Sequence, residues 1–264
     1  MLTAVKNQCK VMLLSVRYNI MREMTNRVSF LMYISFMVLN NATFIIQWLL
    51  LFSLKSDIGG YSINEVMLLW GLAAGTFGFA HVFFTGAFLL SDLILNGKLD
   101  AFLVQPKNVL LSAITSRTSS AAIGDVVYGY LIVIIFQFSI GNLLWFTIYS
   151  IMGAIIMTAF AVITESISFW LVRGDLISDN LNGLIINFST YPDGIFKGVV
   201  RILLFTVLPV GMIVYLPVKL ILKFHLLSFL YLTGFTIGIS LLAFFIFYRG
   251  LKRYSSSNLM IARM

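Results

Sequence analysis

Two carboxylic acids, Asp125 and Glu165, lie inside long apolar stretches of the chain, where ionised side chains are rare. A charge at the centre of a bilayer costs about 3 kcal/mol on insertion scales, so each of these side chains should face protein or a cavity. Such a carboxyl can carry a proton or contact a substrate, or it can be a neutral, hydrogen-bonded packing residue. We expect a structural role for Asp125, because it lies near the start of its stretch, and both interpretations stay open for Glu165.

Other polar and small residues in the apolar stretches point to helix packing. The adjacent amides Asn40 and Asn41 need hydrogen-bond partners in a dry environment, and bonding between helices is favoured over ligand binding. Gly71, Gly75 and Gly78 recur every three or four residues, a small-residue seam that lets helix backbones approach closely. This seam predicts helix packing, including packing between two subunits.

Sequence signatures of catalysis are missing. The two histidines, His81 and His225, are far apart and do not form an H-E-x-x-H motif, and there is no G-x-S-x-G motif. The dipeptide Gly97-Lys98 lacks the glycine that a P-loop requires five positions upstream. We therefore predict that the chain is not an enzyme, and that it has no catalytic residues, cofactor or metal site of its own.

The elements that position these residues are expected to be membrane-spanning helices. Hydrophobic residues make up 60% of the chain and charged residues 11%, and residues 28–54 contain no charge at all. About 20 apolar helical residues cross a bilayer. We predict an all-α polytopic membrane protein with a single domain, residues 1–264, and six crossings. The expected crossings are residues 28–54, 65–90, 119–140 and 144–172, one crossing within residues 180–217, and residues 226–248.

The stretch before the last crossing is difficult to assign. It contains Pro192, Pro209 and Pro217 together with several charged residues, so one uninterrupted helix is not expected there. Residues 173–180 are expected to form a charged cytoplasmic loop, and one net crossing must follow it. Either a helix after residue 180 crosses and a re-entrant pair of half-helices follows, or residues 199–216 cross alone.

The basic residues predict the orientation in the membrane. Five of the 18 lysines and arginines lie in residues 1–27 and four in the last 16 residues. Positive charge concentrates on the cytoplasmic side, so both termini are expected there. Residues 1–27 have an amphipathic pattern typical of an interfacial helix, which either orients the first crossing or contacts a cytoplasmic partner. The net charge of +8 follows from this topology, and no nucleic-acid partner is expected.

A short element in the loop after the second crossing is the most distinctive local feature. Gly97 ends the crossing, and the following residues form a short helix with Leu99, Phe102 and Leu103 on one face before Pro106. An exposed apolar face on a short cytoplasmic helix favours docking into a groove of another protein.

The order of these motifs resembles that of the ABC-transporter permeases of the type-2 exporter superfamily. The resemblance rests on I-x-x-G-x-L-D-x-x-L-x-x-P at residues 94–106, on the proline motifs at 191–192, 208–209 and 215–217, and on the terminal 248–254 segment. The resemblance covers nearly the whole chain. Within the superfamily, the chain is most similar to a bacterial subfamily of permeases of roughly 260 residues.

This resemblance implies a transport subunit in the bacterial plasma membrane. Residues 97–106, with Gly97, Leu99, Asp100, Phe102, Leu103 and Pro106, would form a helix that couples the permease to a separate ATPase, which would hold ATP and Mg²⁺. Two ATPase subunits and a second permease, identical or different, would complete the unit. The expected substrate is hydrophobic or amphipathic. A secondary transporter or channel is the alternative, and an intramembrane enzyme is less favoured.

Overall fold

The computed structural model describes residues 2–255, without the side chains of residues 2–5. The expected basic tail with Arg263 therefore lies partly outside the described residues. Within them the chain is helical throughout, and its only bridge of β type joins Ile58 to Tyr61 across a turn. The prediction of an all-α protein is confirmed for this part of the chain.

Four of the described helices are long and apolar enough to cross a membrane. They are α2 (Arg27–Leu54), Ile63–Leu95, Ile140–Phe169 and α12 (Leu226–Leu251). The second consists of α3 (Ile63–Phe84), η1 (Thr85–Leu89) and α4 (Leu90–Leu95), and the third of α8 (Ile140–Glu165) and η2 (Ser166–Phe169). Two helices of 16 residues, α7 (Ala121–Phe136) and α9 (Gly174–Ser189), lie beside them.

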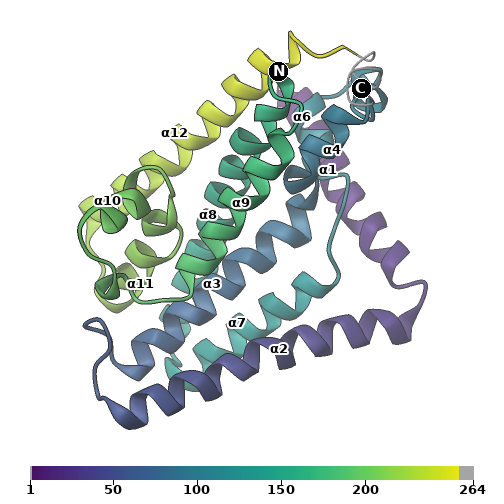
Figure 1. Cartoon of the computed structure of the whole chain (residues 1–264). Coiled ribbons are helices and arrows are strands. Elements are labelled where there is room, and N and C mark those ends of the chain that lie inside the picture. Colours follow the sequence, from purple (N-terminus) through teal and green to yellow (C-terminus); the bar gives the residue numbers. More distant parts are fainter. Residues whose placement is uncertain (1, 256–264) are drawn as a thin grey trace.

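The stretch before α12 folds into short helices at one end of the molecule. They are η3 (Asp193–Ile195), α10 (Gly198–Thr206), a π-helical turn η4 (Gly211–Tyr215) and α11 (Leu216–Leu222). The chain bends by 75° between α10 and the segment Gly211–Leu222. In Figure 1 these elements lie where α9 ends, opposite the end of the molecule that carries α4, α6 and the end of α12.

Two expected boundaries are wrong. The expected crossings at residues 119–140 and 144–172 place a tight turn at residues 141–142 between them, but α8 begins at Ile140 and the chain reverses at residues 137–139. The Asn142 side chain donates to the carbonyl oxygen of Gln137 at 2.9 Å and so closes this reversal from within the first turn of α8. The expected loop at residues 173–180 is mostly helical, since Asp175 lies in the first turn of α9, where a negative charge complements the helix dipole.

The helix α3 lies at the centre of the fold and packs against α7 and α8. The outer helices are far less covered. Within an apolar stretch of 18 residues, 11% of α2 and 17% of α12 is buried inside the molecule, against 67% for the segment Ile140–Phe169. In Figure 1, α2 runs beside α7 and away from α8 and α12. Lipid or another protein must therefore cover α2 and α12.

Small residues allow this central packing. A Cβ atom on Gly78 would lie 2.7 Å from the backbone nitrogen of Val126, and one on Gly71 would lie 3.3 Å from the carbonyl oxygen of Gly129. Gly75 approaches the ring of Phe146 on α8 in the same way. The glycine seam of α3 therefore lies against α7 and α8 of the same chain.

Candidate functional site

A cavity of about 380 Å³ is lined by residues of α2, α3, α7, α8, α9 and η4 and by the two residues that follow α9. Most of its wall is apolar or aromatic, and its polar lining residues are Asn40, Asn41, Thr76, Asp125, Asn187, Ser189 and Thr190. Phe44 of α2 stacks on Trp70 of α3 with ring centroids 4.4 Å apart, and both rings line the cavity. Trp48 and Tyr191 meet edge to face at 6.1 Å, so α2 also contacts the segment that follows α9. A concave, largely apolar space into which some polar groups converge is typical of ligand-binding sites.

One polar pair in the cavity wall joins two helices. Asn41 of α2 donates from Nδ2 to Oδ1 of Asp125 on α7 at 2.6 Å, and both residues are buried. Asn40 also lines the cavity, but its side chain is exposed rather than buried, so the sequence-based expectation of a buried polar residue is wrong for it. Successive helix residues point about 100° apart, which explains why only one of the adjacent amides faces α7.

Three buried polar atoms of the cavity wall have no hydrogen-bond partner among the described residues. They are Oδ2 of Asp125, Nε1 of Trp70 and Oγ1 of Thr76. Buried polar groups are nearly always paired, and exceptions concentrate where a ligand, an ion or water completes the site. From the sequence we expected a structural role for Asp125. Trp70 and Thr76 were not identified, because neither belongs to a recognisable motif.

Glu165 belongs to a different polar group and is not among the residues that line the cavity. Its Oε2 accepts from the backbone nitrogen of Ser91 at 3.0 Å, and its Oε1 accepts from Nδ2 of Asn182 at 3.4 Å. The Ser91 hydroxyl donates to the backbone oxygen of Glu165 and accepts from Ser168. Glu165 therefore connects the end of α8 with α4 and α9, and only 2% of it is exposed.

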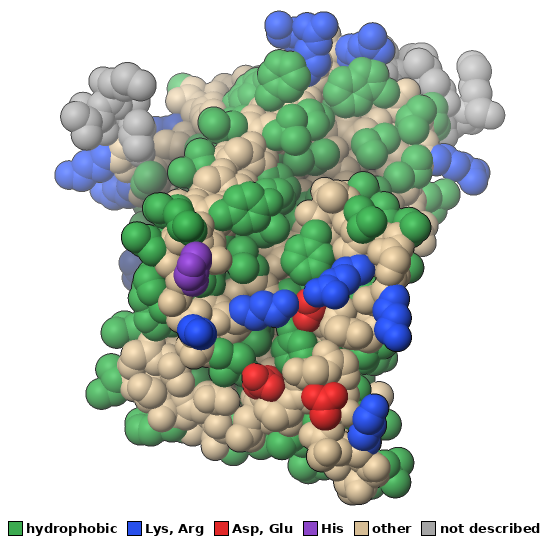
Figure 2. Space-filling view, turned by 90° about the vertical axis from the view of Figure 1, so that its left-hand side faces the viewer, with side chains coloured by type: hydrophobic (Ala, Val, Ile, Leu, Met, Phe, Trp, Pro, Cys, Tyr) green, Lys and Arg blue, Asp and Glu red, His purple; other side chains and the backbone are tan. Residues whose placement is uncertain are grey.

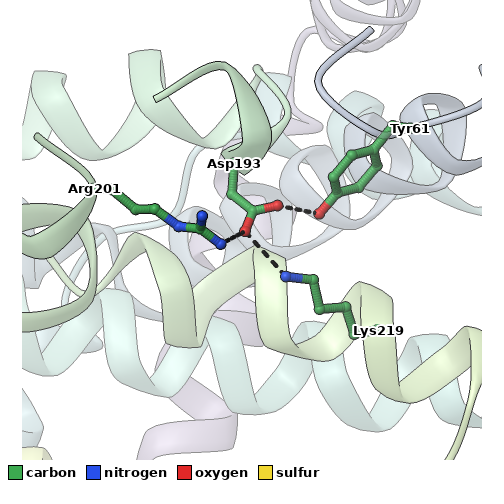
Figure 3. Close-up of polar contacts among 4 residues, drawn as sticks. All are labelled: Tyr61, Asp193, Arg201 and Lys219. Carbon is green, nitrogen blue, oxygen red and sulfur yellow. Dashed lines mark hydrogen bonds and ion pairs between the residues drawn. The ribbon is translucent and has the colours of Figure 1, made fainter. Parts of the chain in front are cut away.

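A second cluster of ionisable residues lies at the end of the molecule that carries α10 and α11. Figure 2 shows acidic and basic side chains gathered on that face. Asp193 of η3 is its centre: it accepts from the Tyr61 hydroxyl at 2.6 Å, from Nζ of Lys219 at 3.0 Å and from Arg201 at 3.3 Å (Figure 3). These contacts tie the loop between α2 and α3 to α10 and α11. We call the four residues the outer clamp, because α10 and α11 lie at the end of the molecule opposite α4 and α6.

The charge of Asp193 is well compensated. Burial acts to raise the pKa of this carboxyl, but the hydrogen bonds from Tyr61 and Lys219 and the charges of Lys219 and Arg201 outweigh it and lower the pKa. Burial and the Asp193 carboxylate both raise the pKa of the Tyr61 hydroxyl, which therefore stays protonated and donates. The sequence shows charged residues among the prolines of this stretch, but nothing in it indicated that Asp193 would pair with Tyr61.

The expected coupling element is a single turn, α5 (Asp100–Leu103), followed by α6 (Val109–Ile114). Gly97 ends α4 with a φ of +67°, a left-handed conformation that favours glycine. The expectation that Leu99, Phe102 and Leu103 share an exposed face is wrong for Leu99, which is fully buried because it packs into the core formed by α4, α6 and α8. Phe102 packs partly against the same core.

The exposed apolar surface of this loop lies one residue further along the chain. Leu103 is 41% exposed and Val104 is 83% exposed, and Pro106 is exposed beside them. Asp100 begins the turn and is half-buried. The loop therefore presents a small apolar surface at residues 103–106.

The first helix, α1 (Leu2–Glu23), is fastened to the two ends of α6, the helix that follows this loop. The Gln8 side chain accepts from the backbone nitrogen of Asn108 at 3.1 Å, and the Ser15 hydroxyl donates to the carbonyl oxygen of Thr115 at 2.8 Å. Val16, the residue after Ser15, is buried. Hence α1 and the 97–106 loop form one surface with α6.

Comparison with known families identifies one match over most of the chain. The family described as ABC-2 family transporter protein matches residues 38–258. The comparisons with curated proteins and with solved structures found no match.

Proposed function

Because this chain belongs to the ABC-2 transporter family and is a permease of that type, we propose that it is the membrane-spanning subunit of an ATP-driven exporter. Its substrate is hydrophobic or amphipathic, and a separate chain binds ATP and Mg²⁺ and performs the hydrolysis. The observation that carries the substrate class is the cavity of about 380 Å³, whose wall combines a larger apolar and aromatic part with a smaller polar part. An amphipathic molecule satisfies both parts of such a wall.

The proposed topology has six crossings, both termini in the cytoplasm and a location in the bacterial plasma membrane. The four long helices are joined by α7 and α9 as shorter crossings, each of 16 residues. At 1.5 Å per residue such a helix is about 24 Å long, slightly less than the hydrocarbon thickness. On this topology α10 and α11 form a re-entrant pair at the outer surface, held by the outer clamp.

The proposed working unit contains two ATPase subunits and a second permease, identical or different. The ATPase contacts the surface at residues 103–106 and the adjoining α1, which share one end of the molecule. The second permease covers part of α2 or α12, which the described chain leaves largely exposed. Gly97, Leu99 and Phe102 position this surface, while Leu103 and Val104 touch the ATPase.

Co-purification with the ATPase subunit tests the proposal. Val104→Asp is expected to reduce recovery of the ATPase complex at least tenfold, because a carboxylate is poorly tolerated in an apolar contact, while the permease itself stays folded. Val172→Asp is the matched control, since Val172 is 57% exposed in the loop between η2 and α9. Transport without any associated ATPase, or an unchanged yield of the complex with Val104→Asp, contradicts the proposed coupling.

A further inference from the structure

The Asp125 carboxyl group is incompletely paired. Asp125 is 4% exposed and lines the cavity, and its only hydrogen bond among the described residues is the one from Asn41 to Oδ1. Its second oxygen, Oδ2, has no partner in the described chain. A carboxylate can accept about four hydrogen bonds, so most of its capacity is unused.

No residue of the cavity wall balances this acid. None of the residues that line the cavity is a lysine, arginine or histidine. An isolated carboxylate in an apolar environment is strongly unfavourable unless a positive charge or a proton accompanies it. Because the wall supplies no cation, the compensating group is either a proton on the carboxyl itself or a cationic group of a molecule that occupies the cavity.

The remaining wall favours an organic cation over a small inorganic one. The stacked rings of Phe44 and Trp70 line the same cavity, and aromatic faces attract ammonium-type cations. Among the described residues no group of three or more His, Cys, Asp or Glu side chains could hold a metal ion. The apolar area of the wall requires an apolar body on the ligand.

We propose that the cavity binds amphipathic organic cations, with Oδ2 of Asp125 as the counter-charge and the Phe44 and Trp70 rings against the apolar body. Asn41 holds Oδ1 and so fixes the orientation of the carboxylate toward the cavity. That these cations are also the transported substrates rests on the proposed function, whereas their binding does not.

Equilibrium binding to the full-length permease in lipid nanodiscs tests the site. The probes are tetraphenylphosphonium and tetraphenylborate, which have the same shape and opposite charge, with the signal of empty nanodiscs subtracted. The wild-type protein is expected to bind the cation at least tenfold more tightly than the anion. Equal affinity for the two probes overturns the proposal without any variant.

Two variants locate the binding. Asp125→Asn is expected to weaken tetraphenylphosphonium binding at least tenfold, and Phe44→Ala about threefold or more. Phe44 lies on the sparsely covered α2, so its replacement keeps the test informative if Asp125→Asn fails to fold. Glu165→Gln is the matched control, because it neutralises an equally buried carboxyl outside the cavity and should leave the affinity unchanged. Unchanged cation affinity in both cavity variants overturns the site.

The same preparation separates this proposal from the proposed function. An ATPase complex that hydrolyses ATP but shows no preference for the cation contradicts the cation site alone. Selective cation binding by a permease that recruits no ATPase supports the site and contradicts the proposed exporter.

Discussion

A single buried carboxylate, that of Asp193, joins the segments at the end of the molecule that carries α10 and α11. Asp193 is 3% exposed, whereas the side chains of its partners Arg201 and Lys219 are 54% and 52% exposed. Two half-exposed cations keep much of their hydration, so the cost of desolvation falls mainly on the carboxylate. The hydrogen bond from Tyr61 compensates part of that cost from the opposite side. The outer clamp thus joins three segments that are distant in sequence.

The lowered pKa of Asp193 gives its contribution to stability a defined dependence on pH. That contribution is complete above the ordinary aspartate pKa of about 3.9 and is lost as the pH falls through the lower folded-state value. Asp193→Asn is expected to destabilise the protein by about 1–3 kcal/mol at pH 7, because the partners then face a neutral amide. The difference from wild type should shrink below pH 4, as measured by thermal unfolding in nanodiscs.

Asp179→Asn provides the control for this measurement. Asp179 is an exposed aspartate on α9 outside the outer clamp, and its replacement should leave stability at pH 7 nearly unchanged. If Asp193→Asn keeps the stability of wild type at pH 7, the clamp contributes nothing and its assigned role is wrong.

The sequence could identify polar residues but not their partners. Asn41 and Asp125 both stand out because they interrupt apolar stretches, yet they lie 84 positions apart and their contact depends on how α2 crosses α7. Glu165 and Ser91 are separated by 74 positions in the same way. Trp70 and Tyr61 gave no signal at all, since aromatic residues are common throughout this chain. Side-chain pairing between helices depends on packing angles that a hydropathy pattern does not contain.

At the scale of elements, the long apolar stretches indicated α2, α8 and α12, although α8 begins at Ile140 and not at residue 144. The helix α9 was harder to predict, because Asp175 and Asp179 made its first turns look like a loop. A charged residue in the first turn of a helix is compatible with the helix dipole, so charge alone did not mark a loop there. The glycines of α3 predicted close packing, and the structure supplies the partner, α7.

The contact between α3 and α7 makes a specific prediction for Gly78. A methyl group at this position would lie 2.7 Å from the nitrogen of Val126 and 2.9 Å from the oxygen of Ala122, and backbone atoms cannot move aside as a side chain can. Gly78→Ala is therefore expected to destabilise the protein by about 1–3 kcal/mol through overpacking. Unfolding in a denaturing detergent measures this loss.

The helix α12 offers the matched control. Nothing lies within 4 Å of a methyl group placed on Gly234, so Gly234→Ala should be neutral or stabilising by up to about 1 kcal/mol. Equal effects of the two substitutions would show that the close approach of α3 and α7 does not contribute to stability.

At the scale of the whole molecule, the sparse burial of α2 and the position of the cavity are connected. The helix that contributes Asn41 and Phe44 to the cavity wall is also the least covered of the four long helices. Few contacts join α2 directly to α9, although residues of both helices line the cavity. The loop at residues 97–106 and α1 lie at the opposite end of the molecule from the outer clamp.

The placement of the fifth crossing can be tested by labelling single cysteines with a membrane-impermeant maleimide in intact cells. Cys9 is free and exposed on α1, and it should react only after permeabilisation. In a Cys9→Ser background, Ser56→Cys should react from outside.

If α9 crosses the membrane, Asn180→Cys should be protected and Lys197→Cys should react. If the bent pair α10–α11 crosses instead, Lys197→Cys should be protected while Lys223→Cys reacts. Labelling of Cys9 in intact cells would contradict a cytoplasmic first helix and, with it, the proposed contact with the ATPase.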